Sequence, residues 1–189
     1  MSDNIIDEFK NSGALLEGHF KLSSGLHSTM YLQSALVLQF PEKAELFGRA
    51  IAEQYKGQKI DVVASPAIGG LIIGHEVARA LGARFIWTER QDGAMTLRRG
   101  FYVKPGERAI VVEDVVTTGG SVRETIEVLK KGGAEVVGAA SIIDRSSGKA
   151  DVGVPLTTLS TLDVRSSDPS ECELCRQGSE AVKPGSRTS

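Results

Sequence analysis

The alternation of short apolar runs with helix-like segments between residues 60 and 143 is the feature that most restricts how this chain can fold. Apolar runs suited to strands occupy residues 60–64, 84–87, 108–112 and 136–143. Helix-like segments follow two of them, at 71–82 and 121–131. Strands that alternate with helices at this pace form βαβ units. The pattern therefore predicts an α/β fold, a parallel sheet with helices on both faces.

The first 57 residues follow a different pattern. A short helix is expected to end at Gly13, and a polar stretch rich in glycine and serine follows at 17–28. Pro41 suits the first turn of a helix, and apolar residues then recur every three or four positions from 44 to 55. These residues predict a small N-terminal unit followed by an amphipathic helix.

Length and charge exclude several classes of protein. The 189 residues suffice for one domain with a sizeable core. The formal net charge is −2, which gives no reason to expect a nucleic-acid or membrane partner. No apolar run approaches 18 residues and the N-terminus lacks the regions of a signal peptide, so we expect a cytoplasmic protein.

The strongest chemical signal lies after the apolar run 109–112. Glu113 and Asp114, the acid pair, come at the carboxyl end of that strand, the edge at which open parallel sheets bind ligands. Two threonines and two glycines follow at 117–120, where glycine lets backbone N–H groups converge on an anion. Ser121 is expected to cap the next helix, with Glu124 completing a capping box.

The acid pair and the residues after it predict different halves of one ligand. Residues 117–121, the phosphate loop, suit a phosphate monoester at a helix N-terminus. The acid pair would repel that phosphate unless it faced sugar hydroxyls or a bound cation. A phosphate and vicinal hydroxyls a few ångströms apart describe a phosphorylated ribose. The alternative is an ordinary strand–helix turn with incidental acids.

Residues 113–121 resemble the PRPP-binding motif of the type I phosphoribosyltransferases. The resemblance implies transfer of ribose 5-phosphate from PRPP to a nitrogen base, with Mg²⁺ as cofactor and loss of pyrophosphate. It implies that Glu113, Asp114 and Arg90 are catalytic. Mg²⁺ would be held mainly through PRPP, so no protein metal ligand is predicted. The implied PRPP site comprises Glu113, Asp114, Val115, Val116, Thr117, Thr118, Gly119, Gly120, Ser121, Ile68, Gly69 and Arg90.

Two further segments narrow the family to the orotate phosphoribosyltransferases, pentosyltransferases of pyrimidine (UMP) biosynthesis. Residues 20–28 with Tyr31 and Leu32 resemble the N-terminal hood of those enzymes. Residues 141–145 resemble a strand ending in Asp-Arg, whose arginine meets the orotate carboxylate; a guanidinium fork can bind both oxygens. An isolated Asp-Arg would instead be an ordinary surface ion pair. The implied orotate site comprises Thr117, Arg145, Ser24, Gly25, Tyr31 and Leu32.

The chain departs from that family at several positions. Ser23 stands where many members have lysine, and residues 68–70 are Ile-Gly-Gly in place of Tyr-Lys-Gly. The family's mobile loop corresponds to residues 89–101, the basic loop, which is shorter here and carries arginines. Arg90 best matches a family basic residue. Two alternatives stay open: a phosphoribosyltransferase for a purine or uracil, and a PRPP-sensing regulator of the same fold.

The resemblance also implies the organisation of the chain. We expect a phosphoribosyltransferase domain at 1–166, with the hood at about 1–40 and the core at about 41–166. Family members form homodimers with shared active sites. The tail, residues 167–189, contains Cys172 and Cys175 in a C-x-x-C spacing, half the ligands of a closed zinc site. We favour reduced cysteines there, with a metal or redox role as the alternative. The three histidines, His19, His27 and His75, are expected to be structural or loop residues.

Overall fold

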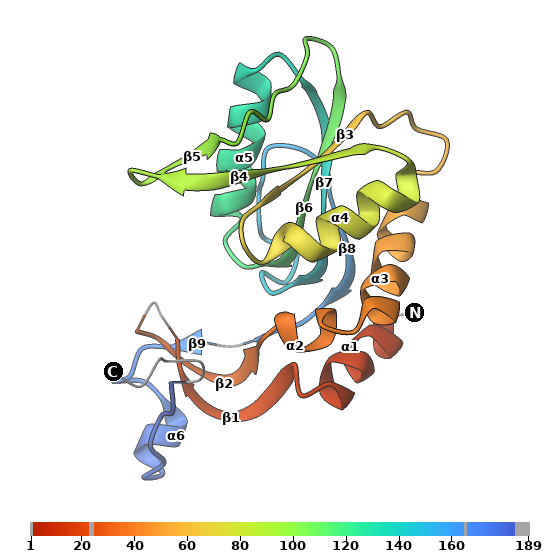
Figure 1. Ribbon diagram of the computed structural model, residues 1–189. Coiled ribbons are helices and arrows are strands. Elements are labelled where there is room, and N and C mark those ends of the chain that lie inside the picture. The colour runs from red at the N-terminus through yellow and green to blue at the C-terminus, as the bar shows by residue number, and fades with distance from the viewer. Residues whose placement is uncertain (1, 23–24, 165, 184–189) are drawn as a thin grey trace.

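A six-stranded sheet forms the centre of the molecule in the computed structural model, which describes residues 2–22, 25–164 and 166–183 (Figure 1). Its strand order is β5-β4-β3-β6-β7-β8, and every neighbouring pair is parallel except β4 and β5. The predicted parallel sheet is confirmed. The strands are β3 (Val62–Pro66), β4 (Arg84–Gln91), β5 (Ala94–Leu97), β6 (Arg108–Val116), β7 (Glu135–Asp144) and β8 (Leu156–Thr161).

Helices cover both faces of this sheet. Helices α3 (Pro41–Glu53) and α4 (Gly70–Leu81) pack on one face and α5 (Gly120–Lys131) on the other. Neighbouring residues of β3 show the division, because Val63 packs on the α3–α4 side while Val62 packs on the α5 side. Both are fully buried, which explains why the strands are apolar without alternation.

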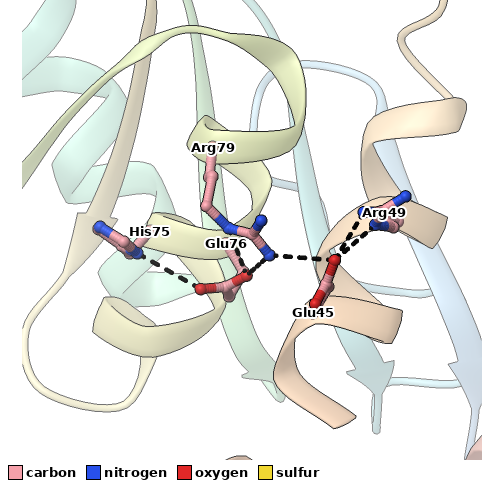
Figure 2. A network of polar contacts seen from close by, with 5 residues as sticks. All are labelled: Glu45, Arg49, His75, Glu76 and Arg79. Carbon is pink, nitrogen blue, oxygen red and sulfur yellow. Dashed lines mark hydrogen bonds and ion pairs between the residues drawn. The ribbon is translucent and has the colours of Figure 1, made fainter. Parts of the chain in front are cut away.

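Close packing joins α3 to α4. A Cβ at Gly48 would lie 2.6 Å from the Cβ of Glu76, so glycine lets the two helices approach. Figure 2 shows polar contacts between the same two helices, where Arg79 lies between Glu76 of its own helix and Glu45 of α3. The Arg79–Glu45 pair is 3.4 Å long and partly exposed, so solvent screens it and it stabilises the crossing little. Close packing at Gly48 therefore contributes more to the α3–α4 contact than this ion pair does.

The N-terminal residues divide between the core and a second sheet. Helix α1 (Ser2–Asn11) packs on the core, with the rings of Phe9 and Phe47 centred 6.0 Å apart, and α2 (Ala35–Leu38) precedes α3. The strands β1 (Leu15–Lys21) and β2 (His27–Leu32) form an antiparallel hairpin below the core in Figure 1. None of the described helices combines the length and the apolar character needed to cross a bilayer.

The tail adds to this second sheet. Strand β9 (Ser166–Ser167) pairs with β2, and Val182 bridges to Phe20 of β1. The short helix α6 (Glu173–Arg176) lies between these two contacts along the chain. The described part of the tail is therefore held against the hood.

The basic loop contains a strand that the sequence pattern did not predict. Residues 94–97 form β5, which pairs antiparallel with the end of β4. The turn between them is Asp92-Gly93, with φ of 51° and 83°. A two-residue Asp-Gly turn with both φ positive is the signal of a tight hairpin. The dipeptide was visible in the sequence, but the low apolar content of its flanks concealed the strands.

Candidate functional site

The acid pair lies within β6, not after its end. The strand was expected to stop at residue 112 but continues to Val116, because it pairs with β7 as far as Val116 opposite Asp144. A Cβ at Gly69 would lie 2.7 Å from Asp114 Oδ1, and one at Gly70 would lie 3.0 Å from Glu113 Oε1. The loop from Ile68, entered through a cis Ala67–Ile68 peptide, therefore contacts the acid pair through glycines.

Burial changes the acidity of one member of the pair. It raises the pKa of Glu113 to about 9, and the neighbouring charge of Asp114 adds to the effect. Glu113 Oε1 accepts a bond of 3.2 Å from the Asp114 N–H, and Asp114 Oδ1 accepts one of 2.8 Å from the Val115 N–H. At neutral pH Glu113 is therefore protonated in the absence of a ligand.

The phosphate loop leads into α5 through glycine rather than through a serine cap. Gly119 is the N-cap residue with φ +74°, and Ser121 lies inside the helix. The predicted capping box is wrong, because the N-cap is Gly119 in a left-handed conformation, two residues before Ser121, and Glu124 pairs with Arg90 instead. Among the described residues, no acceptor receives the N–H groups of Thr117 or Thr118. A hollow of about 110 Å³ is lined by Glu113 and residues 115–122, so these donors surround a space for an anion.

Gly119→Ala should destabilise the protein. The φ of +74° disfavours a side chain, and the added Cβ would lie 2.7 Å from Val152 Cγ1. We expect the free energy of unfolding, measured by urea denaturation, to fall by about 2 kcal/mol. Gly120→Ala is the matched control, since its Cβ would meet nothing closer than Thr118 Oγ1 at 3.7 Å. Equal losses in the two variants would contradict this account of Gly119.

Arg145 lies directly beside the phosphate loop. Its N–H donates to the Val116 carbonyl at 2.8 Å, immediately before Thr117. Burial lowers the pKa of its guanidinium, and Nε is buried without a hydrogen-bond partner. No carboxylate of the described residues forms an ion pair with it. Asp144 accepts instead from the N–H groups of Ser146 and Gly148, at 2.7 and 2.8 Å, so the ordinary Asp–Arg pair is not present.

The arginines of the basic loop are engaged with glutamates of the same chain. Arg90 makes two contacts of 2.9 Å with Glu124 of α5 and donates to the Gly93 carbonyl at 2.7 Å. Arg98 and Arg99 both pair with Glu89, and the hydrogen bond from Arg99 contributes most to lowering the pKa of Glu89. The structure therefore places Arg90 against the first turns of α5, next to the phosphate loop. Its guanidinium is already paired with Glu124.

The hood residues predicted to bind the base have contacts within the hood. The rings of Tyr31 and Phe20 are centred 5.9 Å apart, and Leu32 pairs with Leu15. Gly25 has φ +86° and donates to the Leu22 carbonyl. Ser24 lies outside the described residues. The structure thus assembles the core half of the predicted site, from Glu113 to Ser121 with Gly69 and Arg145, and holds the hood half separately.

Comparison with known proteins agrees with this site. Residues 37–170 match the family described as Phosphoribosyl transferase domain. An orotate phosphoribosyltransferase of Caldicellulosiruptor bescii is 55% identical over 98% of this chain and 97% of its own length. The crystal structure of orotate phosphoribosyltransferase from Aeropyrum pernix has a TM-score of 0.69 at 28% identity, covering 84% of this chain and 93% of that one.

The fold by itself does not identify the base. Adenine phosphoribosyltransferase from Rhodothermus marinus has a TM-score of 0.65 at 22% identity, covering 85% of this chain and 99% of that one. The fold, the phosphate loop and the family match define the class: the chain belongs to the phosphoribosyltransferase family. Over almost its full length the chain is similar to relatives that are all orotate phosphoribosyltransferases, and it belongs among them.

Proposed function

We propose that the chain transfers ribose 5-phosphate from PRPP to orotate, giving orotidine 5′-monophosphate and pyrophosphate, with the phosphate loop and Arg145 binding the two substrates. One observation carries the choice of base: the half-buried side chain of Arg145 has a buried Nε without a hydrogen-bond partner, and the backbone of this residue is bonded to Val116, the residue before the phosphate loop. A buried N–H donor without an acceptor is costly, and a carboxylate on the substrate would supply both an acceptor and a counter-ion. Orotate has that carboxylate, whereas adenine and uracil do not.

The proposed roles follow from position. The N–H groups of residues 117–121 hold the 5′-phosphate, with Val115 and Val116 lining the same hollow. The acid pair accepts hydrogen bonds from the ribose 2′- and 3′-hydroxyls. As the bond from C1 to pyrophosphate breaks, positive charge grows on the ribose ring. The carboxylates next to the ring stabilise it, Glu113 having released its proton to solvent when PRPP and Mg²⁺ bind. Gly69 lies against Asp114, and we assign the pyrophosphate side of the site to the loop that contains Ile68 and Gly69.

Arg90 is proposed to meet the pyrophosphate. Its pairing with Glu124 keeps it at the start of α5, so it would have to exchange that glutamate for a phosphate oxygen when PRPP binds. Glu124 and the phosphate are both negatively charged, and the guanidinium fork of Arg90 can bind either of them. Closure of the basic loop over the substrates would then exclude water from the reacting carbon.

Mg²⁺ fits the acid pair as a supplement to PRPP and not as a separate protein site. Carboxylate oxygens are the ligands that this ion prefers. However, the described residues contain no third acidic side chain grouped with Glu113 and Asp114. PRPP oxygens would therefore provide most of its ligands, and the ion would supply counter-charge to the departing pyrophosphate.

The location and assembly are proposals that rest on the family resemblance. We propose a cytoplasmic homodimer with shared active sites, in which the basic loop of one subunit reaches into the site of the other. The contacts of Gly25 and Tyr31 within the hood are compatible with such sharing. We propose the same division of the chain into a hood at about 1–40, a core at about 41–166 and a tail at 167–189.

The function is tested by mixing the protein with orotate, PRPP and Mg²⁺ and following the loss of orotate absorbance. We expect turnover that requires all three components. Parallel reactions with uracil and with adenine should give none. Turnover on either of these bases without turnover on orotate would overturn the proposal, and PRPP binding without turnover on any base would indicate a sensor.

A further inference from the structure

Two histidines and two cysteines gather where the tail meets the hood. His19 lies on β1 and His27 begins β2, while Cys172 and Cys175 flank the start of α6. All four lie outside residues 37–170, the part that matches the phosphoribosyltransferase family. His27 and Cys175 are 148 positions apart in the chain. The group is therefore brought together by the fold, and none of its four members is among the predicted substrate-binding residues.

The side chains converge through the atoms that bind metals. The four ligand atoms lie within 4.8 Å of one another. His19 Nε2 is 2.9 Å from His27 Nδ1, 3.3 Å from Cys172 Sγ and 3.7 Å from Cys175 Sγ. His27 Nδ1 is 3.3 Å from Cys175 Sγ. Both histidines and Cys172 are more than nine-tenths buried, so three of the four side chains are withdrawn from water.

These separations are close to those of a tetrahedral metal centre. With bonds of about 2.0 Å to nitrogen and about 2.3 Å to sulfur, the edges of a tetrahedron are about 3.3–3.8 Å long. Three of the four distances given above lie in that range, and the His–His distance is shorter by a few tenths of an ångström. The two cysteines also have the C-x-x-C spacing of structural zinc sites. We propose that His19, His27, Cys172 and Cys175 bind one Zn²⁺ ion.

A neighbouring side chain can stabilise the tautomer of His19 that metal binding requires. Ser179 Oγ lies 3.2 Å from Nδ1 of His19, so Nδ1 can carry the ring proton and donate it to the hydroxyl. Nε2 of His19 is then left with its lone pair facing the cluster. Hydrogen bonds of this kind to the second ring nitrogen are the usual means of orienting a zinc-bound histidine.

The ligand set selects the ion and the role. Two thiolates and two neutral imidazoles suit Zn²⁺ and do not suit Mg²⁺, which prefers oxygen. When the ion binds, each thiol releases its proton to solvent, and two thiolates neutralise the 2+ charge in a buried place. Four protein ligands leave no position for a substrate, so the centre is structural.

The location explains what such a centre would do. The tail is attached through a two-residue strand, β9, and a four-residue helix, α6, that buries none of its own residues. Apolar packing is therefore too small to fix it. A metal that joins α6 to β1 and β2 would hold the tail and both strands of the hood together. A disulfide between Cys172 and Cys175 is the competing explanation, but it leaves the convergence of both histidines without a purpose.

Elemental analysis of the full-length protein, purified without chelator, tests the proposal. We expect about one zinc per chain in the wild type and nearly none in a Cys172→Ser/Cys175→Ser variant. His75→Ala is the matched control, since this exposed histidine on α4 is outside the cluster. His27→Cys should retain zinc while His27→Ala should not, which separates ligation from misfolding because cysteine is also a zinc ligand.

Two measurements on the unmutated protein complete the test. Replacement of zinc by Co²⁺ should give the visible absorption of tetrahedral cobalt with two thiolate ligands. Removal of the metal by a chelator should lower the melting temperature by about 5–10 °C, with recovery when Zn²⁺ is added back. Failure of the wild type to bind zinc stoichiometrically at micromolar concentration, full zinc retention in the double variant, or a Cys172–Cys175 disulfide in the native protein would each overturn the proposal.

Discussion

Arg145→Ala should lower kcat/KM for orotate by about two to three orders of magnitude and leave PRPP affinity nearly unchanged. The side chain of Arg145 is half-buried, its Nε has no hydrogen-bond partner, and no carboxylate among the described residues pairs with it. Its backbone N–H is bonded to Val116, the residue before the phosphate loop. Loss of a buried charge pair with the substrate costs about 3–4 kcal/mol, the basis of that factor. Steady-state kinetics with each substrate varied in turn would measure it, with PRPP affinity taken separately by calorimetry.

Two further variants serve as controls for Arg145→Ala. Arg145→Lys keeps the charge but loses the planar fork, so it should recover only part of the activity. Arg49→Ala removes an exposed arginine of α3 and should behave as the wild type. If Arg145→Ala weakened PRPP binding as strongly as it weakened use of orotate, Arg145 would belong to the ribose phosphate site and the reason for choosing orotate would be lost.

The features predicted correctly from the sequence are those fixed by neighbours in the chain. The strands β3, β6 and β7 are buried on both faces, so their apolar runs were visible without the fold. The left-handed conformation of Gly82 ends α4 at the residue where glycine predicted it. The order strand, acid pair, phosphate loop, helix is likewise local, which is why residues 113–121 could be interpreted at once.

The features that were missed depend on distant partners. Ser121 and Glu124 have the spacing of a capping box. However, Glu124 forms an ion pair with Arg90, which lies in a hairpin more than 30 residues away in the chain. Cys172 and Cys175 alone supply half of a zinc site, and the histidines that complete it lie near the other end of the chain. No local pattern connects them. The unpaired state of Arg145 is equally invisible in sequence, because Asp144 beside it suggests a pair that the backbone N–H groups of Ser146 and Gly148 prevent.

Glu113→Gln should make the unliganded protein more stable, and the gain should grow as the pH rises. Burial and the charge of Asp114 raise the pKa of Glu113 from 4.5 to about 9 in the folded state. Below about 4.5 the carboxyl is protonated in both states and has no effect on stability with pH. Between 4.5 and about 9 the unfolded chain loses the proton while the folded protein keeps it, so the free energy of unfolding falls with rising pH. Each pKa unit is worth about 1.4 kcal/mol, and the gain should therefore reach several kcal/mol.

The same substitution should lower kcat/KM for PRPP by about two orders of magnitude, because the amide cannot offer the ribose hydroxyls a negatively charged acceptor or stabilise positive charge on the ring. Thermal unfolding at a series of pH values, with and without PRPP and Mg²⁺, would measure the stability effect. Glu127→Gln, an exposed change on α5, removes the same formal charge and controls for net charge. A stability difference between Glu113→Gln and wild type that did not vary with pH would show that Glu113 is ionised in the free enzyme. The stabilisation expected here, combined with lost activity, would instead mean that the folded protein tolerates an unfavourable carboxyl because the ribose needs it.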